Sequence, residues 1–393
     1  MKRRHLLTLG LTLPLAVPTR LFALPRTQSK FLLVFLRGGY DAANFLVPVS
    51  SQFYYDARPN IAIARPGADG NAALRLDADW GLHPALRDTI YPLYQKRQVA
   101  FVPFCGTDDL TRSHFETQDS IELGQPLEGN RDFQSGFLNR LIGVLGGPVP
   151  ISFTDQLPIV MRGEKDVPNM ALRTLGKPGI DGRQSAIITG MYRRTSLAPQ
   201  VNEGFGVRDE VIGVMAPEME AASRNAITTK GFELEARRVA KLMRDKFDIG
   251  FLDVGGWDTH VGEGGATGYL AGRFEELGRG LAAIAEEMGG AWKNTVIVVL
   301  SEFGRTFREN GNRGTDHGHG TVYWVLGGSV RGGLIRGEQT RVTQATLFQN
   351  RDYPVVNEYR TVLAGLFARM YGLNAAQLDK VLPGARPRDI ALV

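Results

Sequence analysis

The chain has 393 residues, of which 43% are hydrophobic, and this is enough to bury a large core. Its formal net charge of +5 is misleading, because Lys2, Arg3, Arg4 and Arg20 lie in the first 24 residues and the rest carries only +1. No Lys/Arg cluster in that remainder has the form of a phosphate-backbone footprint, which argues against nucleic-acid binding. With Cys105 as the only cysteine, an intrachain disulfide is excluded.

The N-terminus has the pattern of an export signal covering residues 1–24. A basic start is followed by the apolar run Leu6–Val17, which is too short to span a bilayer. The Arg3-Arg4 pair resembles a twin-arginine signal, which implies the twin-arginine translocase as a partner and the periplasm or the medium as the destination. Leu21-Phe22-Ala23 lacks the small residue expected three before the cut, so an uncleaved membrane tether is the alternative.

The segment after the signal opens with a buried strand. Phe31–Leu36 (FLLVFL) is continuously apolar, as in a parallel strand that is covered on both faces. It runs into Arg37-Gly38-Gly39-Tyr40-Asp41, which brings Asp41 to the carboxyl edge of the strand. This acid either belongs to a site or caps a helix, and the sequence leaves both open.

A helix is expected over Pro84–Gln98, followed by the strand Val99–Cys105, in which the cysteine is expected to be a buried strand residue rather than a nucleophile. The next loop turns into a helix that continues through Ile121. Free N–H groups at a helix start attract anions, so Arg112, Ser113 and His114 are candidates for anion binding; a plain Ser113 cap is the alternative.

Residues 150–230 are irregular, with short apolar pieces and scattered Gly and Pro. We expect an insertion or cap there that bears strands of its own. The helical run Gly231–Lys246 then returns the chain to the sheet.

The second half alternates strands and helices. The expected strands are Ile249–Val254, Thr295–Leu300 and Thr321–Leu326, and the expected helices are Tyr269–Met288 and Tyr359–Tyr371. This alternation predicts an α/β fold with a mostly parallel central sheet and helices on both faces.

Chemistry-bearing side chains follow several of these strands. If the strands share one edge, a set of acids, imidazoles and a serine converges there: Asp41, Ser113, His114, Asp258, His260, Glu302, Asp316, His317 and His319. Mixed imidazole and carboxylate ligands suit zinc, manganese or iron(II) better than calcium. The set therefore predicts a divalent-metal site of hydrolytic type, with zinc or manganese favoured.

The order of these residues resembles that of the alkaline phosphatase and sulfatase superfamily, and within it a twin-arginine-exported branch of unknown function. The resemblance spans about residues 31–370 and is carried by FLRGGYDAANFLVP, RSHFETQ, GGWDTH, LSEFGRT and GTDHGHG. It implies an alkaline-phosphatase-like fold formed by one domain over residues 25–393.

The resemblance also implies roles. Asp41 and Glu302 stand where the superfamily places carboxylate ligands of one metal, and Asp258 and His260, with His317 or His319, where it places those of the other. Ser113, at the start of a helix, stands at the position that is similar to the superfamily's nucleophile.

Two departures from the superfamily pattern matter. Glu302-Phe303 replaces the usual Asp-His pair, which removes one imidazole ligand and leaves the number of ions at one or two. Cys105 does not form the Cys-x-Pro-x-Arg pattern of sulfatases, so a standard sulfatase mechanism is not expected.

The functional hypothesis is an exported metal-dependent hydrolase of a small-molecule phosphate or sulfate ester. Ser113 would be the nucleophile, Arg112 or Arg305 would meet developing charge, and His114 would be the general acid or would orient Ser113, with His319 as a further catalytic imidazole.

The alternative is an exported metal- or ligand-binding protein that kept the fold and lost the chemistry, working with a secreted partner. The sequence has no Gly-x-Ser-x-Gly, Gly-x-Gly-x-x-Gly or Walker A motif, which argues against a serine hydrolase of the α/β type and against nucleotide cofactors.

Overall fold

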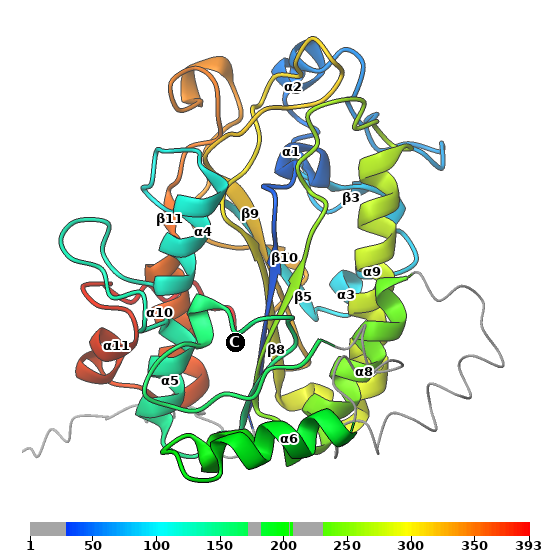
Figure 1. Cartoon of the computed structure of the whole chain (residues 1–393). Coiled ribbons are helices and arrows are strands. Elements are labelled where there is room, and N and C mark those ends of the chain that lie inside the picture. Colours follow the sequence, from blue (N-terminus) through cyan, green and yellow to red (C-terminus); the bar gives the residue numbers. More distant parts are fainter. Residues whose placement is uncertain (1–28, 172–181, 204, 207–230) are drawn as a thin grey trace, which may run out of the picture.

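A computed structural model describes residues 29–171, 182–203, 205–206 and 231–393 (Figure 1). The expected export signal, residues 1–24, lies outside these ranges. Among the helices that the model describes, none combines the length and the apolar character needed to cross a bilayer.

The centre of the molecule is an eight-stranded sheet with the order β10-β5-β9-β8-β1-β7-β6, and β11 also pairs with β5. Its strands are β1 (Lys30–Leu36), β5 (Val99–Gly106), β6 (Pro150–Ser152), β7 (Ile249–Val254), β8 (Thr295–Ser301), β9 (Thr321–Leu326), β10 (Leu334–Ile335) and β11 (Asn357–Glu358). A second, three-stranded sheet has the order β2-β4-β3, with β2 at Leu46–Val47, β4 at Gly81–Leu82 and β3 at Leu74–Arg75.

The central sheet is mostly parallel, as predicted. Only β9 runs antiparallel to its neighbours β8 and β5, whereas β1 is parallel to both β7 and β8. Because β9 follows β8 in the chain and runs antiparallel to it, the loop between them leaves and re-enters the sheet at the same edge. That loop holds residues 302–320, the histidine-rich stretch.

Helices cover both faces of the sheet, as the alternating pattern predicts (Figure 1). The longer helices are α4 (His114–Leu123), α5 (Phe137–Leu145), α6 (Gly182–Tyr192), α8 (Phe232–Asp245), α9 (Tyr269–Met288) and α10 (Tyr359–Tyr371). The shorter ones are α1 (Ala42–Phe45), α2 (Gln52–Ala57), α3 (Ile90–Gln95) and α11 (Ala375–Val381).

Strand β1 is buried on both faces because its alternate side chains enter two separate cores. Leu32 and Val34 belong to the core that includes residues of α8 and α9, and Phe31 and Leu33 belong to the core that includes residues of α5 and α10. This explains why its sequence is continuously apolar. The same burial holds for Cys105, which is fully buried in β5 as expected.

The expected helix Pro84–Gln98 is replaced by a 3-10 turn at Pro84–Leu86 and the six-residue helix α3. Pro92 provides the physical reason, because a proline is tolerated only in the first turn of a helix. A helix starting at Pro84 would place Pro92 in its interior, whereas in α3 it is the third residue.

The irregular segment also differs from expectation where it is described. Pro150–Ser152 forms β6, which adds a parallel edge strand to the central sheet rather than a separate one. Ile159–Met161 forms a 3-10 turn, and the piece Ala186–Ile188 lies within helix α6. The prediction of strands belonging to the insertion itself is therefore wrong for these residues, and the remainder, 172–181, 204 and 207–230, lies outside the described ranges.

The buried His83 generates a prediction about acid stability. Its Nδ1 accepts the Ala85 N–H (3.1 Å), so the proton lies on Nε2, which faces the Gly265 carbonyl oxygen (3.1 Å). Burial lowers the pKa of His83 to about 4, whereas the unfolded value is about 6.5. Between these values the unfolded state binds more protons, so the free energy of unfolding should fall by up to about 3 kcal/mol as the pH drops through that window.

The measurement is urea unfolding at pH 8 and pH 5. His83→Asn keeps a side-chain oxygen for the Ala85 N–H but does not titrate, so its free energy of unfolding should fall less between the two pH values. Equal falls in the wild type and the variant would contradict this origin of acid sensitivity.

Candidate metal centre

Strand register brings the site loops to one place. Leu36 at the end of β1 pairs with Val254 at the end of β7 and with Ser301 at the end of β8. The three following loops therefore start at the same level of the sheet, where ligands bind in open α/β folds. The residues predicted to converge from these loops do so in part.

The centre of the cluster is the Asp258 carboxylate. His260 Nε2 lies 2.9 Å and His317 Nε2 lies 3.3 Å from Asp258 Oδ1, and these two nitrogens are 3.2 Å apart. His114 Nε2 lies 3.5 Å from the other oxygen, Oδ2. Three imidazoles therefore present the same ring nitrogen to one carboxylate.

The opposite ring nitrogen of each imidazole is tied to a hydrogen-bond acceptor. His114 Nδ1 lies 2.8 Å from Glu302 Oε1, His260 Nδ1 lies 3.1 Å from Asp316 Oδ1, and His317 Nδ1 lies 3.0 Å from the Arg112 carbonyl oxygen. A carbonyl or an ionised carboxylate only accepts, so each Nδ1 carries the proton. In the neutral imidazoles the three Nε2 atoms therefore present lone pairs.

These lone pairs face one another and a carboxylate, which is unfavourable unless a cation lies between them. His114 Nε2 is moreover buried without a hydrogen-bond partner. The hydrogen bond to Glu302 raises the pKa of His114, whereas burial and then the neighbouring His114 lower the pKa of His317. The cluster thus has the electrostatics of a site that takes up a proton or a metal ion.

The spacing fits a metal. His114, Asp258 and His317 each offer one ligand atom, and these atoms all lie within 4.8 Å of one another. Two ligands at zinc distances in a tetrahedron are about 3.3 Å apart, close to the separations above. His260 reaches the same carboxylate and provides a third nitrogen, the fourth candidate ligand atom of the cluster. Hydrogen bonds from Nδ1 to carboxylates or carbonyls are the usual support of metal-bound histidines.

Arg305 is a buried support of Asp258. Its Nη1 donates to Asp258 Oδ1 (2.6 Å), and its Nη2 donates to the Thr315 carbonyl oxygen. Burial alone would raise the pKa of Asp258, but the hydrogen bond and the charge of Arg305 bring it below its usual range. This guanidinium, predicted to meet substrate charge, instead holds the central carboxylate ionised.

Glu302 and Asp316, both predicted as metal ligands, contact the imidazoles from behind. Glu302 is fully buried, and it accepts hydrogen bonds from Gly38 N–H (2.8 Å), His114, Gln118 (2.9 Å) and Ser301 (2.8 Å). Asp316 accepts from His260 and Asn310. In this structure they orient the imidazoles of His114 and His260 rather than face the centre of the cluster.

Asp41 lies apart from the cluster. Its carboxylate forms a buried ion pair with Arg58, and it caps α1 by accepting the Ala43 N–H (3.2 Å). Burial would raise the pKa of Asp41, but the Arg58 charge lowers it. The capping alternative is thus confirmed, and the expectation that Asp41 converges with the histidines does not hold, because Arg58 already neutralises it.

Ser113, Arg112 and His319 also differ from their expected places. Ser113 Oγ caps α4 by accepting the Glu116 N–H (3.5 Å), and the Arg112 side chain pairs with Asp352 (2.7 Å). The His319 ring packs against Phe348, with 4.9 Å between the ring centroids. Of these three, Arg112 alone touches the cluster, through its backbone carbonyl.

Two glycines allow this packing. Gly38 has φ +123°, and an added Cβ would lie 2.7 Å from the Asp258 backbone nitrogen. Gly39 has φ +62°, and its Cβ would lie 2.5 Å from the Phe303 ring. Phe303 in turn contacts the rings of His114 and His317, at centroid distances of 4.9 Å and 5.2 Å. The Gly-Gly pair is therefore needed for close approach of three loops.

Several supporting residues were not singled out in the sequence: Arg58, Gln118, Glu263, Asn310 and Asp352. Each is polar and lies in a loop or on a helix without a periodic signal. A buried arginine opposite an acid has no local sequence signature, so only the tertiary structure reveals these pairs.

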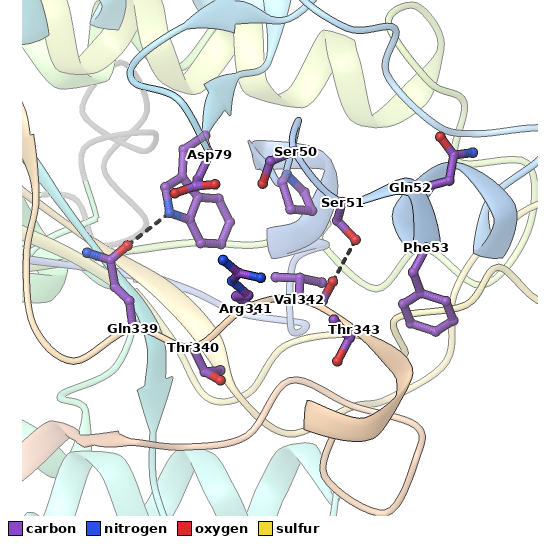
Figure 2. Close-up of a pocket in the computed structure, with 12 residues that line it drawn as sticks. Ser50, Ser51, Gln52, Phe53, Asp79, Gln339, Thr340, Arg341, Val342 and Thr343 are labelled. Carbon is purple, nitrogen blue, oxygen red and sulfur yellow. Dashed lines mark hydrogen bonds between the residues drawn. The ribbon is translucent and has the colours of Figure 1, made fainter.

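A cavity of about 690 Å³ lies elsewhere (Figure 2), and its lining contains none of the predicted site residues. It is lined by Pro48, Ser50, Ser51, Gln52, Phe53, Asp79, Trp80, Gln339, Thr340, Arg341, Val342 and Thr343. Trp80 donates to Gln339 (2.9 Å) and Ser51 donates to the Val342 carbonyl oxygen (2.6 Å), so part of its polar lining is already paired.

Comparison with known proteins identifies a family. Residues 28–382 match the family model described as "Protein of unknown function (DUF1501)". The chain belongs to this family. No curated protein matches it.

Two solved structures have a weak likeness to the chain: the crystal structures of Ps i-CgsB alone and in complex with k-i-k-neocarrahexaose. They are 11% and 10% identical, with TM-scores of 0.38 and 0.36. Each match covers 92% of this chain and 75% of the other.

The glycine packing generates a prediction. Gly38→Ala should destabilise the fold by about 2–4 kcal/mol and weaken metal binding, because the new methyl group displaces the backbone at Asp258 and adopts an unfavourable φ. Urea unfolding and zinc titration would measure both. Gly147→Ala is the matched control, since a Cβ there meets nothing within 4 Å. Wild-type behaviour of Gly38→Ala would contradict the prediction.

Proposed function

We propose that this protein is an exported metal-dependent hydrolase of phosphate or sulfate esters. The proposal rests on the arrangement of three imidazoles. Each has its Nδ1 hydrogen-bonded to an acceptor, and all three direct Nε2 at the Asp258 carboxylate. Exposed carboxylates often cluster without a metal, but imidazole lone pairs directed at a carboxylate call for a cation. Zinc or manganese suits this N/O set.

One ion fits better than two. His114, His260, His317 and Asp258 would hold it, whereas Arg58 neutralises Asp41 and four donors saturate Glu302. A bound divalent ion would supply Lewis-acid stabilisation of negative charge on the ester oxygens. With His114 as a ligand, its proposed role changes from general acid to metal binding.

Ser113 remains the proposed nucleophile. It immediately precedes His114, and among the described residues its Oγ makes only the long capping contact with the Glu116 N–H. Its Oγ would form a bond to phosphorus or sulfur as the bond to the leaving alcohol breaks, and the Oγ proton would end on that alcohol. Water would then hydrolyse the Ser113 ester, which restores the hydroxyl and releases the inorganic acid. The start of the ten-residue helix α4 adds partial positive charge at this position.

The alkaline-phosphatase-like fold is part of the proposal. It is supported by a mostly parallel sheet that is covered on both faces and carries its polar loops at the carboxyl edge of the parallel strands. Export through the twin-arginine translocase rests on the basic and apolar pattern of residues 1–24, with an uncleaved membrane tether as its variant.

A second candidate is a metal-binding protein without turnover that acts with a secreted partner. Phe303 favours it, because this ring packs against two imidazoles where the superfamily resemblance implies a ligand histidine. The two candidates share the metal and differ in chemistry.

The metal is tested first. The purified protein should bind about one zinc or manganese ion per chain, measured by elemental analysis and titration after chelation. Asp258→Asn should weaken binding by at least about 10–100-fold, which is the loss caused even by outer-shell changes. Asp253→Asn is the matched control, because Asp253 pairs with Arg37 instead (2.7 Å). A wild-type protein that binds no metal would overturn the centre.

Turnover is tested separately with aryl phosphate monoesters, aryl phosphate diesters and aryl sulfates. The metal-loaded protein should hydrolyse at least one of them, and Ser113→Ala should lower kcat by about 100-fold or more if Ser113 is the nucleophile. Activity unchanged in both Ser113→Ala and Asp258→Asn would refute the assignment. Metal binding without turnover on the whole panel would instead support the binding protein.

A further inference from the structure

Glu263 is a buried acid that the proposed chemistry does not use. Its side chain is fully buried, and its Oε2 accepts two hydrogen bonds, from Thr259 Oγ1 (2.8 Å) and from Thr315 Oγ1 (2.9 Å). The two threonines belong to different loops, one after β7 and the other between β8 and β9. A single carboxyl oxygen therefore joins both loops.

Each threonine lies directly beside residues of the cluster. Thr259 separates Asp258 from His260, and Thr315 immediately precedes Asp316 and His317. Thr315 also receives the Arg305 Nε hydrogen bond (3.3 Å), so the support of Asp258 passes through the same residue. A shift of either threonine would move at least one ligand.

Backbone hydrogen bonds run alongside the Glu263 contacts. The Thr315 N–H donates to the Thr259 carbonyl oxygen (3.0 Å), the Glu263 N–H to the Arg313 carbonyl oxygen (3.0 Å), and the Gly262 N–H to the Asn312 carbonyl oxygen (2.9 Å). The two loops thus lie in a defined register with Glu263 at its buried side. The backbone bonds set this register, and the Glu263 contacts hold it from the buried side, as precise sites require of their supporting residues.

We propose that Glu263 is a positioning residue that fixes the separation between the loop of Asp258 and His260 and the loop of Asp316 and His317. Its effect on metal affinity rests on the proposed metal centre, whereas its effect on the two loops does not. Its role is to accept from both threonines at once, which an amide oxygen also does. Glu263→Gln should therefore preserve the function, and Glu263→Ala should lose it.

The first readout is amide hydrogen exchange of the metal-free full chain. In Glu263→Ala the Gly262 and Thr315 amides should exchange at least about tenfold faster than in the wild type, because the threonine hydroxyls lose their buried acceptor. Amides of β7 and β8 should keep their protection. In Glu263→Gln the loop amides should exchange within about threefold of the wild-type rate.

The second readout is metal affinity. Zinc titration should give a Kd about 10–100-fold weaker for Glu263→Ala, and the visible spectrum of the cobalt-substituted protein should change, as expected when ligand geometry loosens. The control is Asn139→Ala, which removes an equally buried anchor with bonds to the Met161 (2.9 Å) and Lys165 (2.7 Å) carbonyl oxygens. It should leave both readouts unchanged.

If the loop amides of Glu263→Ala exchange at the wild-type rate, the positioning role is overturned, whether or not the protein binds metal. Failure of the wild type to bind metal would overturn the proposed function and leave the exchange test decisive for Glu263. If Glu263→Ala does not fold, Thr259→Val removes one of the two bonds to Glu263, and Thr315→Val removes the other together with the acceptor of the Arg305 Nε hydrogen bond. Each should speed exchange of the loop amides, and no change in either variant would refute the role.

Discussion

The site depends on β1 lying between β7 and β8 in parallel register. Leu36 pairs with both Val254 and Ser301, so three chain segments far apart in sequence leave the sheet side by side. Gly38 and Gly39 then let the loop after β1 pass within contact distance of Asp258 and Phe303. The cluster of imidazoles forms at this crossing because the sheet has already paid the entropy of bringing the loops together.

The polar groups around the cluster follow one rule: a charge buried by the fold has a partner of opposite sign or several donors. Arg58 accompanies Asp41, Arg305 accompanies Asp258, and Glu302 accepts from four donors. Two buried atoms depart from this rule, since neither His114 Nε2 in the cluster nor Glu263 Oε1 beside it has a hydrogen-bond partner among the described residues. Incomplete pairing at His114 thus sets the cluster apart from the Asp41–Arg58 ion pair, in which both charges are matched.

Much of the fold could be predicted from the sequence. Strands such as Ile249–Val254 and helices such as Tyr269–Met288 have strong periodic or continuous apolar patterns, and the structure reproduces their bounds. The helix predicted over Pro84–Gln98 is wrong, because its apolar spacing is helical but Pro92 cannot occupy the interior of so long a helix. For the site, the polar residues after the strands indicated the correct edge of the sheet. Asp41 and Glu302 resembled metal ligands, because the sequence does not show that Arg58 and Gln118 donate hydrogen bonds to them.

Phe303 determines from which direction the cluster can be approached. The ring is buried and lies against His114 and His317 on their inner side, whereas the Asp258, His260 and Asp316 side chains remain 43%, 40% and 51% exposed. Solvent and solutes thus reach the cluster from one hemisphere only. A molecule that approaches the cluster would therefore arrive past His260 and Asp316 rather than through the sheet.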